Sequence, residues 1–228
     1  MPQAVNTLYV VATPIGNLSD ITLRAIEILR SADYIACEDT RVTKKLLDHY
    51  KISKPLVSFH HHSPEKKFSE IAALLKQGKN IALVSDAGTP GISDPGGRLI
   101  EYLTNELGDK VKIIPIPGPA AFAAALSVSG FPAEEFTFLG FPPHKKGRQT
   151  FFKRIALIKN TAVFYESPHR ILKALELLKN ECPDRPMVVC RELTKIYEEI
   201  IRGTADEILN YYQARPEKVR GEFAVVLG

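Results

Sequence analysis

The residues whose types and spacing best suit a binding site are two aspartates in a glycine- and proline-rich stretch. This stretch, residues 85–97, reads SDAGTPGISDPGG. The stretch follows an apolar run at 81–84, so we expect a loop at the carboxyl end of a buried strand, where open α/β sheets bind ligands. Its glycines let the backbone approach a ligand closely. Asp86 and Asp94 add negative charge without a lysine, which favours a cationic or neutral polar ligand over a phosphate. A surface connection rich in turn-forming residues would have the same composition.

A second candidate cluster is Glu38-Asp39-Thr40-Arg41, which follows an expected strand at 34–37. An exposed arginine here could hold a phosphate while Asp39 orients it or orients a substrate hydroxyl. A helix-capping turn with a local ion pair is the alternative. Three consecutive histidines, residues 60–62, follow the next expected strand. No cysteine or carboxylate lies at an obvious ligand spacing from them, so we predict no metal site.

A basic segment, residues 144–154, contains five lysines and arginines and no acidic residue. Such a patch pairs with phosphates, although a solvated loop and helix face would look the same. The whole chain is only mildly basic, with a formal net charge of +4.

The composition is that of an ordinary globular protein, with 45% hydrophobic and 25% charged residues among 228. The three cysteines lack CxxC spacing, which favours reduced thiols and argues against zinc. No apolar run reaches membrane-spanning length and no signal pattern opens the chain, so we expect a cytoplasmic protein without a membrane partner.

Apolar strand patterns alternate with helical patterns along the chain, which predicts an α/β fold with mostly parallel sheets. We expect two α/β lobes, residues 1–116 and residues 117–228, the second carrying the basic segment. The first strand–turn–helix lacks GxGxxG, so the fold is not of the dinucleotide-binding type. If the polar strand ends of the two lobes face each other, a ligand would bind in a cleft between them.

Eight blocks of the sequence resemble, in order and spacing, the family of ribosomal small-subunit RNA cytidine 2′-O-methyltransferases in the tetrapyrrole-methylase-like superfamily. They are TPIGNLSDITLRA, CEDTRVTKKLL, SDAGTPGISDPG, IPGPAAFAAAL, GFPP, FYESPHRI, CRELTKIYEE and GEFAVV. The resemblance covers nearly the whole chain. It implies a homodimeric enzyme that uses S-adenosylmethionine to methylate a cytidine ribose in the decoding centre of 16S ribosomal RNA. Many members continue beyond the last strand with a helical region, whereas this sequence stops at Gly228.

The resemblance also implies a set of cofactor residues, with the cofactor between the lobes. The backbone at Pro14 and Ile15 and the 86–89 loop would hold the methionine part, residues 119–121 would lie beside the cofactor, and the remaining second-lobe residues would flank the adenosine. The residues implied are Pro14, Ile15, Asp86, Ala87, Gly88, Thr89, Pro119, Ala120, Ala121, Tyr165, Glu166, Leu193, Phe223 and Ala224.

Methyl transfer to a ribose hydroxyl needs alignment of the reacting atoms and a base that takes the proton. Spacing does not single out the base among Glu38, Asp39, His60, His62 and Glu166. As catalytic residues we name Asp39, Arg41 and Glu166. As RNA-binding residues we name Arg41, Lys44, His60, His62, Lys145, Lys146 and Arg148.

Two other functions fit the same sequence. A tetrapyrrole C-methyltransferase of the precorrin type would share the fold and the cofactor. A non-catalytic RNA-binding or ribosome-assembly factor would use the cofactor structurally. The basic segment and the Glu38–Arg41 cluster favour RNA over a tetrapyrrole.

Overall fold

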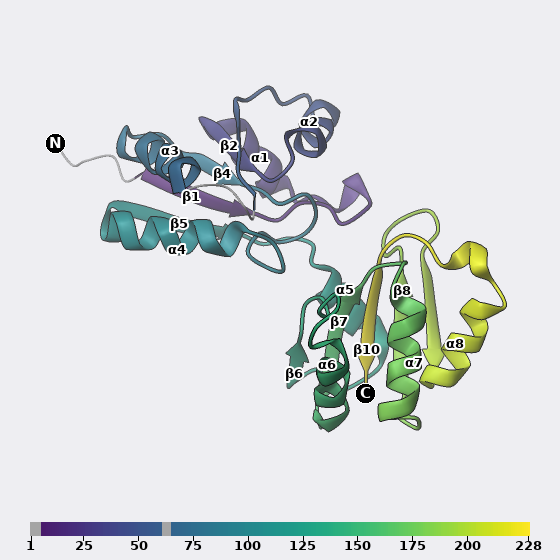
Figure 1. Ribbon diagram of the computed structural model, residues 1–228. Helices are drawn as coiled ribbons and strands as arrows, with labels where there is room; N and C mark the ends of the chain where they lie inside the picture. The colour runs from purple at the N-terminus through teal and green to yellow at the C-terminus, as the bar shows by residue number, and fades with distance from the viewer. Residues whose placement is uncertain (1–5, 61–64) are drawn as a thin grey trace. The chain divides into compact units, whose positions relative to one another are not determined.

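The computed structural model describes residues 6–60 and 65–228 and divides the chain into two compact units, Met1–Ala120 and Ala121–Gly228. The sequence analysis expected the division between Ile116 and Pro117. Each unit has its own sheet and its own buried core (Figure 1).

The first unit is built on a fully parallel sheet in the order β3-β2-β4-β1-β5. Its strands are β1 (Asn6–Val11), β2 (Tyr34–Cys37), β3 (Leu56–Ser58), β4 (Ile81–Leu83) and β5 (Val111–Ile116). The three residues of β4 are all buried because helices cover both faces of the sheet. The predicted parallel α/β architecture is confirmed for this unit.

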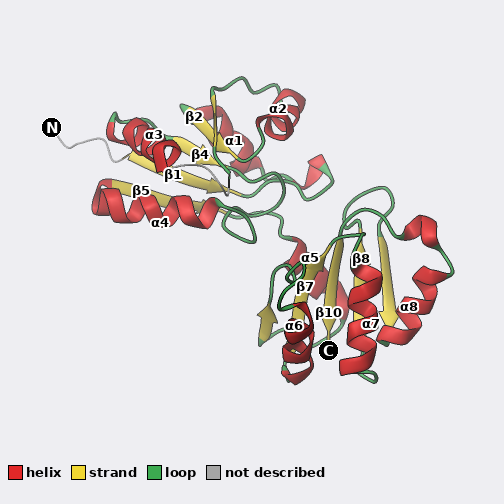
Figure 2. Cartoon of the chain, in the orientation of Figure 1, coloured by secondary structure: helices red, strands yellow, loops and turns green. Residues whose placement is uncertain are grey.

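Helices cover both faces of this sheet. One face packs α1 (Leu23–Ser31) and α2 (Thr40–His49), and the other packs α3 (Glu65–Lys76) and α4 (Gly96–Leu107). Short 3₁₀ turns lie at η1 (Leu18–Asp20) and η2 (Gly108–Lys110). Because all the strands are parallel, the loops that follow them gather at one edge, which we call the carboxyl edge (Figure 2).

The second unit contains a mixed sheet in the order β6-β7-β10-β8-β9. Its strands are β6 (Phe136–Phe138), β7 (Thr161–Glu166), β8 (Met187–Arg191), β9 (Glu199–Gly203) and β10 (Phe223–Leu227). Only β6 and β7 pair in parallel, whereas β10 pairs antiparallel with β7 and β8, and β8 pairs antiparallel with β9. The expectation of a mostly parallel sheet is therefore wrong for this unit. A hairpin joins β8 to β9, and the final strand returns into the middle of the sheet.

The two faces of the second sheet are covered unequally. Three helices lie side by side on one face, α6 (Arg148–Leu157), α7 (Ile171–Glu181) and α8 (Ala205–Gln213) (Figure 1). A single helix, α5 (Ala121–Ser129), packs on the other face. A 3₁₀ turn, η3 (Pro216–Lys218), precedes the last strand.

None of the helices in the described part of the chain is both long and apolar enough to cross a membrane.

Candidate functional site

The carboxyl edge of the first sheet joins the loops that follow β1, β4 and β5. An antiparallel bridge links Thr13 to Gly88, with backbone hydrogen bonds of 2.9 and 3.1 Å. The Thr13 hydroxyl also donates to the carbonyl oxygen of Ser85 at 3.2 Å. The Thr89 hydroxyl donates to the carbonyl oxygen of Pro119 at 3.0 Å. These bonds fix three loops against one another.

Gly88 lies in the segment that bridges to Thr13. Its φ of +80° is the left-handed conformation that favours glycine. A Cβ at this position would lie 3.4 Å from Ile15 Cγ2 and 3.7 Å from the Pro119 carbonyl oxygen. The structure therefore brings together Ile15, Gly88 and Pro119, three of the residues that the sequence analysis assigned to the cofactor.

The two aspartates of the 85–97 loop have different surroundings. Asp94 Oδ1 accepts the backbone N–H groups of Gly91 and Gly96 at 2.8 and 2.7 Å, so this carboxylate fastens the loop to the start of α4. Asp86 is exposed, and the hydrogen bond that its Oδ1 accepts from the described residues comes from the backbone N–H of Asp39, at 3.0 Å. Asp86 is therefore the aspartate available to a ligand.

Carboxylates gather at this edge. Loss of hydration raises the pKa of Glu38, and the negative charges of Asp86, Asp94 and Asp39 raise it further. Loss of hydration also raises the pKa of Asp86, although its hydrogen bond from the Asp39 backbone partly offsets this. A cation at the edge would relieve this repulsion between like charges.

Asp39 and Arg41 form the capping turn that the sequence analysis considered as an alternative. Asp39 is the N-cap of α2, and its Oδ1 accepts the Arg41 backbone N–H at 2.8 Å. The Arg41 side chain pairs with Asp39 Oδ2 at 2.6 Å and is 86% exposed. These hydrogen bonds from Arg41 lower the pKa of Asp39 to about 2, which makes it a poor proton acceptor. In this arrangement Asp39 orients Arg41.

A pocket of about 180 Å³ opens beside Asp86. This volume is smaller than the roughly 300–1,000 Å³ of complete small-molecule sites, so the pocket fits a fragment of a cofactor. The residues that line it come from the strand ends, η1 and α2: Thr13, Pro14, Leu18, Val42, Thr43, Lys45, Leu46, Ser85 and Asp86.

In the second unit, most residues assigned to the adenosine lie on the face of the sheet that α5 covers. Tyr165, Leu193 and Ala224 all belong to this cluster, and the Tyr165 hydroxyl accepts the Phe122 backbone N–H at 2.9 Å. Ala121 begins α5. Phe223 is different, because strand alternation sends its side chain into the opposite core, where it packs on Tyr212. The side chain of Phe223 is therefore not available to a cofactor in this arrangement.

Glu166 and Arg148 form a buried ion pair, which corrects two predictions. Arg148 is 6% exposed and its guanidinium donates to Glu166 Oε2 at 2.6 Å, so it is not part of an RNA-binding surface. Glu166 Oε1 pairs with Arg170 at 3.0 Å and accepts the Ser167 N–H at 2.8 Å. With both oxygens engaged, Glu166 is not a free proton acceptor in this arrangement.

The other predicted RNA-binding residues lie in three places. Lys44 is exposed on α2, three residues and less than one helical turn after Arg41. Lys145 and Lys146 are exposed just before α6. His60 is exposed after β3, and His62 lies outside the described residues. Within residues 6–60 and 65–228, no three His, Cys, Asp or Glu side chains are arranged to hold a metal ion.

Comparison with known proteins identifies the family. Residues 7–209 match the family described as Tetrapyrrole (Corrin/Porphyrin) Methylases. Among solved structures, diphthine synthase superposes with a TM-score of 0.72 at 17% identity, over 98% of this chain and 90% of that one. A cobalt precorrin-4 methyltransferase gives 0.67 at 20% identity, over 97% and 94%. The chain belongs to the tetrapyrrole methylase family.

Closer relatives share much more sequence. The ribosomal RNA small subunit methyltransferase I of Halalkalibacterium halodurans is 47% identical, over 97% of this chain and 75% of the relative. The protein of the same name from Thermotoga maritima is 45% identical, over 96% and 97%. The resemblance found in the sequence is thereby confirmed.

The chain is a methyltransferase that uses S-adenosylmethionine as its methyl donor. The carboxyl edge of the first sheet suits this cofactor, which carries a sulfonium cation. Asp86 supplies a carboxylate with a single backbone partner among the described residues, and Gly88 leaves room for Ile15 and the Pro119 carbonyl oxygen beside it. The sequence gives no reason to prefer Glu38 over Asp39, because the two carboxylates are neighbours in the chain. Only the structure shows that burial raises the pKa of Glu38 while Arg41 lowers that of Asp39.

Proposed function

We propose that this protein methylates the 2′-hydroxyl of a cytidine in 16S ribosomal RNA, with S-adenosylmethionine as donor. The relatives at 45–47% identity are named for methylation of the small-subunit ribosomal RNA, which supports this substrate over a tetrapyrrole. The observation that carries the proposal is the combination of an acidic carboxyl edge with exposed cations near it on the same unit, Arg41 and Lys44.

We assign the methionine part of the cofactor to the loops of the first unit. Pro14 and Ile15, the 86–89 segment, and Pro119 with Ala120 present backbone groups there, and Asp86 places its carboxylate beside the pocket. Tyr165, Glu166, Leu193 and Ala224 in the second unit stay predictions for the adenosine, and Ala121 stays a prediction for a residue beside the cofactor. For Phe223 the assignment is limited to its backbone.

When bound, S-adenosylmethionine supplies a methyl group that moves to the hydroxyl oxygen as its bond to sulfur breaks. A ribose hydroxyl is a weak nucleophile, so a residue of the chain must accept its proton. Glu38 is the best candidate, because loss of hydration and neighbouring carboxylates make it more basic than an ordinary glutamate. Asp39 holds Arg41 in place, and the exposed guanidinium of Arg41 can contact a phosphate as well.

Two finer points also stay proposals. We expect a homodimer, as the resemblance implies, and a cytoplasmic enzyme, since its substrate is the small ribosomal subunit.

Lys145 and Lys146 are exposed and carry no ion pair among the described residues, which leaves both free to contact phosphates.

Methyl transfer with labelled cofactor tests the substrate class. We expect label on the small ribosomal subunit or its RNA, and none on a precorrin-type tetrapyrrole. Label on the tetrapyrrole alone would show a C-methyltransferase instead. Cofactor binding and RNA binding without transfer to any acceptor would indicate a non-catalytic assembly factor.

A further inference from the structure

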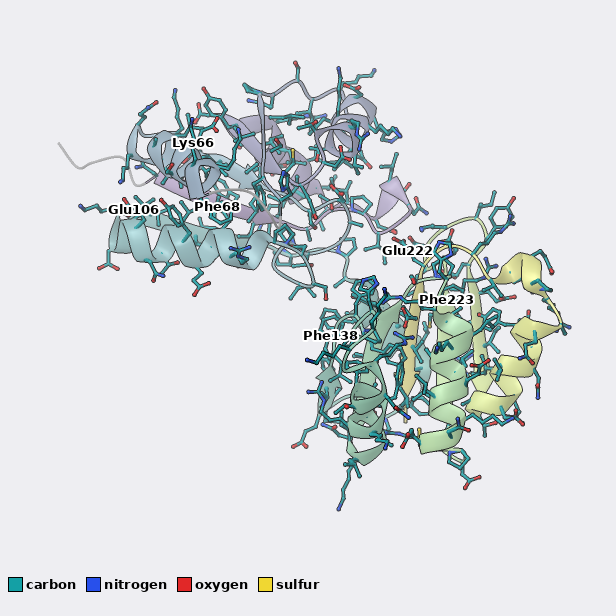
Figure 3. All side chains as sticks on the ribbon, viewed as in Figure 1. Lys66, Phe68, Glu106, Phe138, Glu222 and Phe223 are labelled. Carbon is teal, nitrogen blue, oxygen red and sulfur yellow. The ribbon has the colours of Figure 1, made fainter. Side chains whose placement is uncertain are left out.

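An exposed tyrosine stacked with an arginine lies in the second unit and has no part in the function described so far. Tyr197 is 56% exposed, and the neighbouring Ile196 is 91% exposed. The guanidinium carbon of Arg220 lies 5.2 Å from the centre of the Tyr197 ring. Both residues come from loops at one end of the sheet, the 192–198 loop after β8 and the turn before β10, where Figure 3 labels Glu222.

The 192–198 loop is held by a network of ion pairs. Lys195 Nζ lies 2.7 Å from Glu192 Oε1 and 2.8 Å from Glu222 Oε2. Glu192 Oε1 also accepts the Glu222 N–H at 3.0 Å, and the Thr194 N–H donates to Glu198 at 2.6 Å. These contacts tie the loop to the turn that carries Arg220.

The backbone of this loop is strained and is anchored from below. Glu192 and Thr194 have positive φ angles of 52° and 68°, which residues other than glycine adopt only when their surroundings hold them there. The guanidinium of Arg191, which is 5% exposed, donates to the Tyr197 carbonyl oxygen at 3.0 Å. The Tyr197 ring is therefore presented to solvent by a fixed backbone.

The chemistry of the pair matches an unpaired nucleotide. Proteins bind single-stranded RNA by stacking bases on aromatic rings and on guanidinium planes, while basic groups attract the phosphates. Arg220 is exposed and has no carboxylate partner among the described residues, so its charge remains available. A single exposed apolar residue is ordinary, but an exposed ring on a held backbone, next to an exposed guanidinium, offers both contacts at once.

We propose that Tyr197 and Arg220 form a stacking platform for an unpaired base of the RNA substrate. This platform rests on the proposed function, because it assumes that the protein acts on RNA. It adds an RNA contact outside the basic segment and the carboxyl edge, and it requires a single-stranded region at the target.

Binding of purified small ribosomal subunits by the full chain tests the platform. Replacing Tyr197 by Ala is expected to weaken binding about tenfold, within the range for one stacked base, and Tyr197→Phe should restore it because the ring remains. Arg220→Ala should weaken binding and reduce its dependence on salt. Arg215→Ala is the matched control, because it removes the same charge from another arginine that stacks on a tyrosine. The guanidinium carbon of Arg215 lies 4.2 Å from the centre of the Tyr211 ring. Cofactor affinity should not change in any of these variants.

The outcomes separate the platform from the proposed function. If the wild type binds and methylates subunits and Tyr197→Ala does so equally well, the platform is wrong and the proposed function stands. If the wild type neither binds nor methylates subunits, both fail. If Tyr197→Ala breaks a dimer while RNA affinity per protomer is unchanged, the exposed pair is a protein contact and the platform is overturned.

Discussion

Two neighbouring carboxylates, Glu38 and Asp39, show how surroundings assign different chemistry to similar residues. Hydrogen bonds from Arg41 lower the pKa of Asp39 to about 2, whereas loss of hydration and nearby negative charges raise the pKa of Glu38. Only the second change makes a carboxylate a better proton acceptor. The two residues are adjacent in the chain, so their roles could not be separated before the structure was known.

Replacing Glu38 by Gln tests its role as the base. We expect kcat to fall at least a hundredfold, as for loss of a general base. In the wild type, kcat/KM should fall as the pH is lowered through the raised pKa, and this fall should begin at a higher pH than for an exposed glutamate. Measurement of kcat/KM against pH for both proteins checks this, with Glu101→Gln on the exposed part of α4 as control. A Gln variant with wild-type kcat would exclude Glu38.

The same substitution has an expected effect on stability. Folding raises the pKa of Glu38, so its charged form is disfavoured in the folded state and weakens the fold at pH values above that pKa. The Tm of Glu38→Gln at neutral pH should equal or exceed that of the wild type. A clear drop in Tm would mean that the carboxylate is a structural residue.

The charge of Asp86 is expected to contribute to cofactor affinity. Asp86→Asn keeps an oxygen that can accept the Asp39 N–H, but it removes the negative charge beside the pocket. We expect S-adenosylmethionine to bind about tenfold more weakly in calorimetry, consistent with loss of one charged contact. Asp109→Asn, at an exposed carboxylate in η2, should bind like the wild type. Equal affinity in the Asp86 variant would remove this residue from the site.

At the scale of the elements, a buried cluster holds the 140–147 loop to the end of β7. Arg148 donates to the Pro143 carbonyl oxygen as well as to Glu166, and Arg170 donates to the Pro142 carbonyl oxygen, each backbone contact measuring 3.4 Å. Arg148, which belongs to the same basic segment, therefore anchors the loop that carries Lys145 and Lys146. One basic segment serves two purposes, which its composition does not reveal.

Because Arg148 is buried and Lys145 is exposed, alanine substitutions at these two positions should have different effects on the free energy of unfolding. Arg148→Ala removes one of the two arginines that pair with the buried Glu166 and should destabilise the protein by about 1–3 kcal/mol, because Arg170 still pairs with that carboxylate. Lys145→Ala should change stability by less than about 0.5 kcal/mol, because its side chain is exposed. Urea denaturation of both variants measures the difference. Equal stability of the two variants would contradict the assignment of Arg148 to the core.

The strand ends and the loops after them could be predicted from the sequence, and the partners across the fold could not. The 81–84 run and the 85–97 loop are local patterns, and the structure has both a strand and a loop there, although β4 ends at Leu83 and α4 already begins at Gly96. The second sheet shows the limit. β9 has half-buried residues at the sheet edge and no clear alternation, and α6 begins without a side-chain cap. The ion pair between Arg148, the first residue of α6, and Glu166 joins residues 18 positions apart, which spacing alone does not predict.

At the scale of the whole molecule, the two units contribute different chemistry to one proposed reaction. The first unit has the acidic edge and the pocket beside Asp86, and the second has the exposed pair of Lys145 and Lys146. The alanine double variant of these lysines should lower the salt dependence of RNA binding, with a change in slope of up to about 1.4 for single strands. Its affinity for S-adenosylmethionine should not change. A salt dependence equal to that of the wild type would show that the lysines are only solvated surface.

The position of the transferred methyl group is the most direct test of the proposed function. Small ribosomal subunits are incubated with the protein and labelled S-adenosylmethionine, and their 16S RNA is then digested to nucleosides and separated. We predict that the label is recovered as 2′-O-methylcytidine. Label on a nucleobase, or no label in the RNA while a tetrapyrrole is methylated, would contradict it.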